Sequence, residues 1–234
     1  MRIALISDLH ANLQATHAVL TELDSLKPDA VLCLGDLIGY GPRPDEVVSM
    51  IREREYPTLL GNHDAVLTGR LSFKFFREPN RSLLKQSAEL LSEENRNWLA
   101  SRPLIIENDM WIAAHASPLQ PDHWEYLDSA IKCQQVLEKL PEEKKLVFVG
   151  HTHRAGMAAN EFGVFGLKAG YRFVINPGSV GQYRDEDHRA SFCIVDTENY
   201  QLEQHKLSYD TQDTLLDYQT LGIKKAKAKQ LLGV

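Results

Sequence analysis

Apolar residues gather in short runs over the first 150 positions, and each run ends in a polar motif. The runs are aliphatic and rich in β-branched side chains, which is typical of buried strands. They cover residues 3–6, 30–34, 58–60, 110–113 and 146–149. The motifs that follow them are Ser7-Asp8-Leu9-His10, Gly35-Asp36, Gly61-Asn62-His63-Asp64, Ala114-His115-Ala116 and Gly150-His151-Thr152-His153. We expect five strands that deliver these side chains to one rim of one sheet, since open α/β sheets bind ligands beyond the carboxyl ends of their strands.

The segments between the first three runs predict helices. From 13 to 26, after Asn12 as an N-cap, apolar residues recur at helical spacing until Pro28 ends the pattern. Pro44 suits the first turn of a second helix that reaches Glu55. Strand and helix therefore alternate over the first sixty residues, which favours βαβ units with parallel pairing.

Residues 65–102 break this alternation. Their pattern is helical from 82 to 99, and the segment comes directly after the motif that contains Asn62. We expect a small helical insertion here. Two interpretations of it stay open, because it could form a lid over the polar motifs or a helical layer that packs on the sheet.

The rest of the chain is richer in strands. Residues 104–107 and 110–115 flank an Asn-Asp turn and predict a hairpin, and 129–140 predicts a helix before the fifth run. Short strands are expected at 162–165, 173–175, 191–195 and 201–205. From 207 to 234 the pattern is that of a helical tail, whose lysines favour a solvated face over a contact with a partner. A length of 234 residues favours a single domain over 1–234.

Composition is that of an ordinary globular protein. The chain is 43% hydrophobic and 25% charged, and its net charge of −6 argues against nucleic acid as the main partner. No apolar stretch approaches the roughly 18 residues that span a bilayer, and no signal peptide precedes the first run. The three cysteines lack metal or redox spacing, and Cys33 and Cys193 in apolar runs are expected to be buried thiols. We therefore expect a cytoplasmic protein without a membrane partner.

The polar motifs hold nearly all the metal-ligand chemistry of the chain. They offer carboxylates, an amide and imidazoles just beyond the predicted strand ends, at Asp8, His10, Asp36, Asn62, His63, His115, His151 and His153. Imidazole and carboxylate without thiolate suit Mn, Fe, Zn, Co or Ni better than Ca or Mg. Eight such groups exceed the needs of one ion, so we expect two, with the two oxygens of Asp36 able to bridge them. Metal pairs about 3.5–4 Å apart suit the hydrolysis of phosphoesters.

The ordered series Asp-x-His, Gly-Asp, Gly-Asn-His-Asp, a lone His and Gly-His-x-His resembles the calcineurin-like metallophosphoesterase superfamily over residues 2–196. Residues 176–181, Asn-Pro-Gly-Ser-Val-Gly, resemble its small bacterial and archaeal phosphodiesterase branch. The resemblance implies a four-layer α/β/β/α sandwich, a metal-dependent phosphoric ester hydrolase and, in many relatives, a homo-oligomer. We expect phosphodiesters ahead of phosphomonoesters, or small phosphorylated metabolites including nucleotides, as substrates.

The resemblance also implies a role for each motif residue. One metal would be held by Asp8, His10, Asp36 and His153, and the other by Asp36, Asn62, His115 and His151. Mn is the favoured metal, and a metal-bridging hydroxide would be the nucleophile. His63 lies where the family places a general acid or transition-state stabiliser outside the coordinating set. Asp64 is expected to orient His63 and to favour its protonated form.

The residues around these motifs say less about the substrate. After Gly35-Asp36 the chain lacks the arginine with which protein Ser/Thr phosphatases hold a phosphomonoester. Arg184 is our candidate for that contact and Tyr40 for the border of the pocket, although Arg43, Arg154 and Tyr183 compete with them and ordinary surface or packing roles stay open. Two alternatives remain beside the phosphodiesterase: a Ser/Thr phosphatase-like monoesterase, and a non-catalytic scaffold on the same fold.

Overall fold

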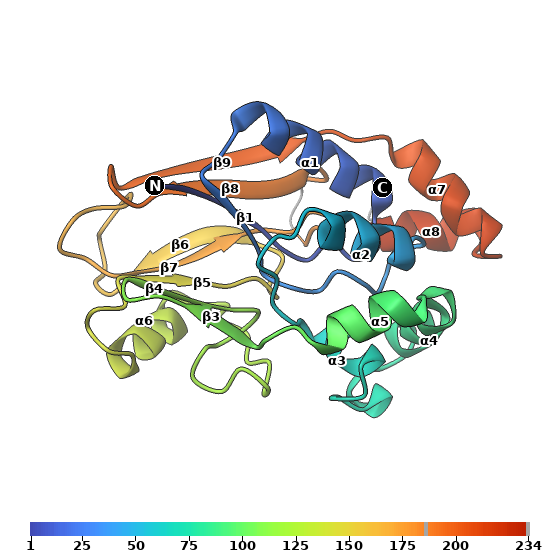
Figure 1. Cartoon of the computed structure of the whole chain (residues 1–234), viewed down its shortest axis with the longest axis horizontal. Coiled ribbons are helices and arrows are strands. Elements are labelled where there is room, and N and C mark those ends of the chain that lie inside the picture. The colour runs from blue at the N-terminus through green and yellow to red at the C-terminus, as the bar shows by residue number, and fades with distance from the viewer. Residues whose placement is uncertain (185–186, 233–234) are drawn as a thin grey trace.

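Two mixed β-sheets pack face to face in the computed structural model, which describes residues 1–184 and 187–232 (Figure 1). The first sheet contains, in spatial order, β2 (Ala30–Cys33), β1 (Arg2–Ile6), β8 (Ala190–Asp196) and β9 (Gln201–Leu207). The second contains β3 (Ile105–Glu107), β4 (Trp111–Ala114), β5 (Leu146–Phe148), β7 (Phe173–Pro177) and β6 (Ala155–Ala159). β1 and β2 are parallel, and so are β4, β5 and β7.

Helices cover the outer faces of both sheets. α1 (Leu13–Leu26) and α2 (Pro44–Glu53) share an apolar cluster with the outer face of the first sheet. A second cluster fills the space between the sheets, and a third joins α6 (Ala130–Lys139) to the second sheet. These layers form the four-layer α/β/β/α sandwich that the sequence resemblance implied, so that expectation is confirmed.

The side chains of β1 point alternately into the two apolar clusters on either side of the first sheet. Ala4 and Ile6 belong to the cluster beneath α1, whereas Ile3 and Leu5 belong to the cluster between the sheets. Successive side chains of a strand point to opposite faces, and both faces of this strand are covered. A strand buried on both sides needs an unbroken apolar sequence, which is why residues 3–6 lack polar positions.

The prediction of one sheet for all five motifs was wrong. The motifs of Asp8 and Asp36 follow strands of the first sheet, whereas those of His115 and His151 follow strands of the second. Runs that are buried on both faces look alike whichever sheet they join, so the sequence did not separate them. Residues 58–60 form no full strand either, and only an isolated bridge joins Thr58 to Cys33.

The second sheet departs from the expected strands at one further place. Residues 162–165 form a loop in which Phe162 and Phe165 are exposed, and Gly163 and Gly166 take positive φ. The strand that precedes this loop is β6, whose sequence Ala-Gly-Met-Ala-Ala lacks the β-branched and aromatic residues that mark strands. Sheet pairing with β7 decides the conformation of β6 instead.

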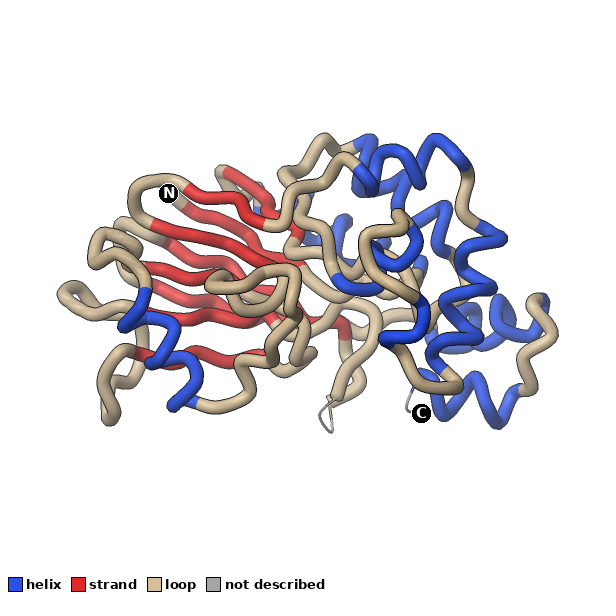
Figure 2. The backbone as a smooth tube through the Cα atoms, turned by 90° about the horizontal axis from the view of Figure 1, so that it is seen from below, coloured by secondary structure: helices blue, strands red, loops and turns tan. Residues whose placement is uncertain are grey.

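Most helices gather at one end of the molecule, and the strands lie toward the other (Figure 2). Residues 65–102 contain the second half of α3 (Asn62–Leu67), a 3-10 turn, α4 (Asn80–Leu90) and α5 (Glu93–Ala100), with Ser92 as the N-cap that separates the last two. The predicted tail contains α7 (Thr211–Thr220) and α8 (Lys225–Leu232), while residues 233–234 lie outside the described part. No helix in the described ranges is long and apolar enough to cross a bilayer.

Candidate metal centre

The loops after β1, β2 and β5 adopt an unusual backbone. Asp8, His10, Asp36, His151 and His153 all have φ between 47° and 66°, in the left-handed region. Non-glycine residues visit this region at a cost, and they gather at functional sites because the surroundings hold them there. Here the loops hold one another, since Asp8 N donates to the Gly35 carbonyl and His10 N to the Asp36 carbonyl, each over 3.0 Å.

This backbone turns the predicted ligand side chains toward one point between the edges of the two sheets. Their nitrogen and oxygen atoms form three groups that share residues. Within each group, the ligand atoms lie within 4.8 Å of one another. The groups are Asp8 with His10 and His153, His10 with Asp36 and His63, and Asp36 with His115 and His151. All these residues are buried, as is Asn62. The structure therefore assembles residues that are as many as 145 positions apart (153 − 8) into one cluster.

Three of the imidazoles are held in one tautomer. His10 Nδ1 donates to the Ile38 carbonyl over 2.9 Å, His115 Nδ1 to the Leu34 carbonyl over 2.8 Å, and His153 Nδ1 to the Gln182 carbonyl. A carbonyl only accepts, so Nδ1 carries the proton in each neutral ring and Nε2 presents a lone pair. The Nε2 atoms of His10 and His153 are 3.0 Å apart. Two lone pairs that face each other repel, and a cation bound between them would remove this repulsion.

Several buried polar atoms in the cluster form no hydrogen bond of good geometry. Within the described residues, no hydrogen bond reaches Asp8 Oδ1, Asn62 Oδ1, His115 Nε2 or His151 Nε2. An unsatisfied buried polar atom costs about 1–3 kcal/mol, and more if it is charged. All four atoms are of the types that bind divalent transition metals, His115 Nε2 once it has lost its proton. The residues present therefore fit a metal centre.

Burial and charge set the protonation of the histidines. Burial lowers the pKa of His10 to about 4 and the pKa of His151 to about 3, so both are neutral at pH 7. Burial also disfavours the charged form of His115, but the Asp36 carboxylate outweighs it and raises the pKa of His115 to about 9. Metals bind neutral imidazole. A cation that bound between His115 and Asp36 would therefore displace a proton.

Asp36 lies at the centre of the cluster. Its Oδ1 accepts the His63 backbone N–H over 2.9 Å, while its Oδ2 lies 3.3 Å from His115 Nε2 and 3.8 Å from His10 Nε2. Only Oδ2 therefore faces both ligand groups. From the sequence we had expected the two oxygens of Asp36 to bridge the ions together. A Cβ at Gly61 would stand 2.1 Å from Oδ1, so the close approach of these loops requires glycine there.

Asp64 does not hydrogen-bond the His63 ring, contrary to our expectation, but binds the backbone of neighbouring loops. Its carboxylate accepts four backbone N–H groups, those of Asp36, Leu37, Ile38 and Gly61, at 2.9–3.3 Å. These bonds favour the ionised form against burial and the Asp36 charge, which together raise the pKa of Asp64 to about 7. Asp64 therefore holds the loop that carries Asp36, and we correct its assignment as the residue that orients His63.

His63 also differs from expectation in its charge. Its Nδ1 is buried without a hydrogen-bond partner among the described residues, and burial lowers the pKa of His63 to about 3. The ring is therefore neutral at pH 7 rather than protonated. It packs edge-on against His10 and Phe76, with ring centroids 4.8 and 4.6 Å apart. Its Nε2 lies 3.9 Å from Asp36 Oδ2, at the border of the metal cluster.

Replacement of Asp64 tests its structural role. In Asp64→Asn one carboxylate oxygen becomes an amide NH₂ that faces two backbone N–H donors, so two hydrogen bonds are lost. We expect the free energy of unfolding to fall by about 3 kcal/mol, measured by urea titration in the presence of chelator. Asp24→Asn is the control, because Asp24 forms a solvent-exposed ion pair with Arg54, and exposed pairs contribute little to stability. Similar losses in both variants would contradict this role.

A pocket of about 310 Å³ opens onto the metal cluster. Its lining joins cluster residues to side chains from distant loops and from the helical insertion: Asp36, Tyr40, Asn62, His63, Phe75, Phe76, Arg77, Asn80, Tyr126, His151, His153 and Arg184. The insertion thus borders the site through residues 75–80. Whether it moves as a lid stays a prediction.

The candidate substrate residues Tyr40 and Arg184 both line this pocket. The Arg184 guanidinium lies 3.5 Å from the hydroxyls of Tyr40 and Tyr126. Tyr126, which the sequence reasoning missed, stacks on His151 at 4.0 Å. Its only sequence signal was an aromatic residue in the turn-rich segment after the His115 motif. The competing arginines lie elsewhere, since Arg43 pairs with Asp217 and Arg154 is absent from the lining that the structure describes.

The Asn-Pro-Gly-Ser segment, residues 176–179 at the carboxyl end of β7, binds the metal loops to each other. Ser179 Oγ donates to the Asp8 carbonyl over 2.8 Å, and Asn176 Nδ2 donates to the Gly150 carbonyl over 2.6 Å. β7 lies parallel to β5, so its carboxyl end reaches the same edge. The segment therefore links the loop of the first sheet to the His151 loop of the second.

A two-sheet sandwich with a buried histidine and aspartate cluster at its strand ends is the arrangement of a metallophosphoesterase. A family model of the calcineurin-like phosphoesterase superfamily domain matches residues 1–200. The chain belongs to this superfamily, as its motifs had led us to expect. The family implies phosphoester hydrolysis and divalent metal ions, for which the cluster supplies the ligand types.

Relatives agree with this membership. An uncharacterized protein of Methanocaldococcus jannaschii is 35% identical over 218 residues, which cover 89% of this chain and 88% of that protein. The crystal structure of a metallophosphoesterase from Sphaerobacter thermophilus superposes with a TM-score of 0.84 at 33% identity, over 100% of this chain and 99% of that one. A symmetrical bis(5'-nucleosyl)-tetraphosphatase of Vibrio parahaemolyticus is 29% identical over 129 residues, 52% of this chain and 45% of that enzyme.

Proposed function

We propose that this protein is a dinuclear metal-dependent phosphoesterase that hydrolyses phosphodiesters or small phosphorylated metabolites, including nucleotides. The observation that carries the proposal is the set of buried, unpartnered ligand atoms that converge beside Asp36. The cluster as a whole offers more ligand atoms than one ion needs, and two of its three groups, Asp8 with His10 and His153 and Asp36 with His115 and His151, share no residue. Both groups border a pocket that is open to a substrate.

Each metal is assigned a set of ligands that shares Asp36. The first set is Asp8, His10, Asp36 and His153, and the second is Asp36, Asn62, His115 and His151. Two divalent transition-metal ions, with Mn favoured, would supply a water of lowered pKa as nucleophile and neutralise the phosphoryl oxygens. The fixed Nδ1–carbonyl bonds orient the three imidazoles of His10, His115 and His153 for this task.

His63 acts on the substrate and not on the metals. It lines the pocket, and its backbone N–H is bound to Asp36, so its ring is held beside the cluster. With its pKa lowered to about 3 by burial, the ring is neutral and donates an N–H hydrogen bond. A bond to a phosphoryl or leaving-group oxygen that strengthens as negative charge develops lowers the barrier.

The rim of the pocket selects the substrate. Arg184 supplies positive charge and Tyr40, Tyr126 and Phe75 supply aromatic surface. Such a rim suits a phosphoryl group that carries an organic substituent, which a phosphodiester has on both sides. The similarity to a bis(5'-nucleosyl)-tetraphosphatase supports the inclusion of nucleotide anhydrides among the candidates.

A substrate panel on metal-loaded protein tests the function. We expect Mn²⁺ to support turnover of bis(p-nitrophenyl) phosphate at a higher kcat/KM than p-nitrophenyl phosphate, and EDTA to abolish both reversibly. Dinucleoside polyphosphates and phosphopeptides complete the panel. Absence of turnover with Mn²⁺ or Ni²⁺, together with no bound metal, would establish the scaffold alternative. A preference for phosphopeptides would establish the Ser/Thr phosphatase-like monoesterase.

A further inference from the structure

The C-terminal helices reach back to the pocket although they lie beyond residues 1–200, which the family model matches. α7 and α8 pack on each other through an apolar cluster that contains Leu215, Tyr218 and Leu231, with Leu83 of α4 packed against it. Figure 1 shows α7 and α8 next to each other at the end of the molecule that also holds α2, α4 and α5. The tail thus contacts the elements that surround the pocket.

Tyr218 of α7 contacts the pocket loop directly. Its hydroxyl donates to the Tyr40 carbonyl over 2.9 Å, and the Tyr218 side chain is only 2% exposed. Within the described residues, that hydroxyl is the one hydrogen-bond donor that reaches this carbonyl. Tyr40 has a left-handed φ of 52°, a conformation that a bulky residue keeps only where its surroundings impose it. The buried hydroxyl of Tyr218 is one such constraint.

The ring of Tyr40 packs against histidines of the cluster. Its centroid lies 4.7 Å from that of His10 and 4.8 Å from that of His63. Its hydroxyl accepts from Asn80 Nδ2 over 3.2 Å and lies 3.5 Å from Arg184. Tyr40 is therefore held at its carbonyl by the tail and at its hydroxyl by the helical insertion, with its ring between them above the candidate catalytic histidine.

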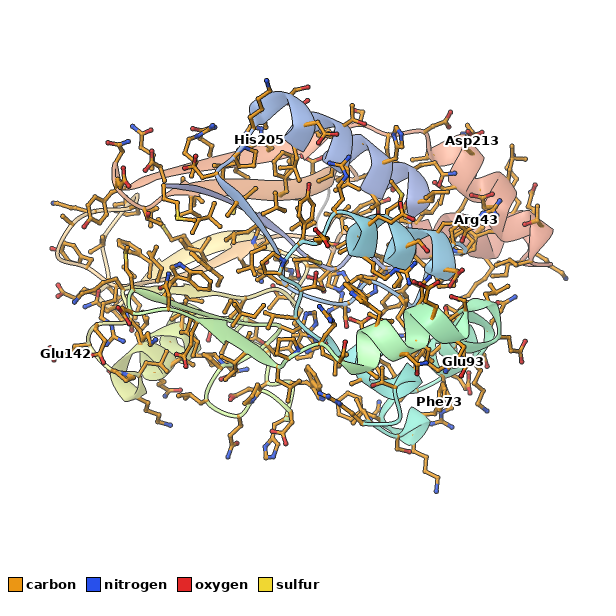
Figure 3. The ribbon with its side chains drawn as sticks, in the orientation of Figure 1. Arg43, Phe73, Glu93, Glu142, His205 and Asp213 are labelled. Carbon is orange, nitrogen blue, oxygen red and sulfur yellow. The ribbon has the colours of Figure 1, made fainter. Side chains whose placement is uncertain are left out.

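The tail is fixed in place by polar contacts on two sides. The Asp217 carboxylate accepts from Arg43, the residue before α2, and from Gln14 Nε2 of α1 over 3.0 Å. Figure 3 shows Arg43 between α2 and the C-terminal helices. On the other side, Gln86 of α4 donates to the Leu221 carbonyl over 3.3 Å. α7 is therefore a rigid support for the hydroxyl of Tyr218.

We propose that Tyr218 is a positioning residue, which holds the ring of Tyr40 in the pocket so that it contacts the substrate. This inference rests on the proposed function, because it assigns Tyr40 to the binding of the phosphoester. Tyr218 itself lies behind the loop and does not line the pocket. Its effect on the reaction is transmitted through the backbone of Tyr40.

Removal of a single oxygen atom tests the proposal. In Tyr218→Phe the Tyr40 carbonyl loses its donor while the apolar packing of α7 is kept. We expect KM for bis(p-nitrophenyl) phosphate to rise about five-fold, the effect of one hydrogen bond, with kcat changed less than about two-fold. Tyr209→Phe is the matched control, since the Tyr209 hydroxyl accepts from Asn12 and does not contact Tyr40. KM in the control should stay at the wild-type value.

A double-mutant cycle separates positioning from general stability. In a Tyr40→Ala background the ring is absent, so Tyr218→Phe should leave KM unchanged. An equal rise in KM in both backgrounds would overturn the proposal, as would a Tyr218→Phe enzyme with wild-type KM.

Amide hydrogen exchange provides a readout that does not depend on turnover. Exchange at residues 37–43 should accelerate in Tyr218→Phe and stay unchanged in Tyr209→Phe, with exchange in β5 unaffected in both. Unchanged exchange at 37–43 would contradict the support of the loop by Tyr218. If the wild-type protein turned over no phosphoester while this exchange accelerated, the proposed function would fail and the mechanical link would stand.

Discussion

Asp36→Ala is expected to lower kcat/KM for phosphodiesters by about a thousand-fold and to deplete the purified protein of metal. Asp36 Oδ2 is the oxygen that faces both ligand groups, so its loss weakens both metal sites together. Metal ions stabilise the transition state of such reactions by several kcal/mol, and about 4 kcal/mol corresponds to a thousand-fold in rate. The measurements are metal analysis of the dialysed protein and steady-state kinetics with added Mn²⁺.

Thermal unfolding gives an independent measure of the same loss. A metal present at 100 times its Kd stabilises the wild-type protein by about 2.7 kcal/mol, which raises Tm by about 5–10 °C in a chain of this size. We expect Asp36→Ala to lose this increase. Asp24→Ala, at an exposed carboxylate that pairs with Arg54, should keep both the metal and the rate. Wild-type metal content in Asp36→Ala would refute the assignment of Asp36 as the shared ligand.

Unlike Asp36→Ala, the variant His63→Ala should lose activity without losing metal. We expect both metals to be retained while kcat falls by about 10²–10⁴-fold, the range for the loss of one acid–base or charge-stabilising group. The reason is that the His63 ring lines the pocket, while the assigned ligands of both sites remain in place. The Mn²⁺-dependent rise in Tm should therefore survive in His63→Ala.

A surface histidine serves as the control for that variant. His17→Ala removes an exposed imidazole of α1, so it should change neither kcat nor metal content. If His63→Ala lost as much metal as Asp36→Ala, the division between ligands and substrate-facing residue would be wrong. His63 would then belong to the coordinating set, as its grouping with His10 and Asp36 within 4.8 Å permits.

The sequence predicted the cluster well because each ligand lies directly after an apolar run. Asp8 and Asp36 follow the parallel neighbours β1 and β2, whose carboxyl ends lie at the same edge of the first sheet. His151 follows β5 of the second sheet, and the packing of the two sheets brings it to Asp36. The helix 13–26 was likewise predicted with its bounds, because Asn12 caps it and its apolar face is periodic.

Tertiary contacts explain what the sequence did not predict. The neighbours of Asp64 in sequence suggested a partner in His63, but its four hydrogen bonds go mainly to amides 26–28 residues away. Tyr126 and Asn80 join the pocket from loops and an insertion whose placement has no periodic signal. Protonation of His63 follows burial, which also depends on the packed structure.

The central position of β1 has a consequence for synthesis of the protein. β1 is synthesised well before β8, yet it pairs with β8, where Leu5 lies opposite Cys193, and Gly181 N donates to the Asp8 carbonyl. Because domains emerge from the N-terminus at about 5–20 residues per second, the Asp8 loop waits roughly ten seconds or more for its neighbours. A nascent chain therefore exposes its ligands singly before they meet. The metal centre can therefore bind its ions only after β8 has been synthesised and has paired with β1.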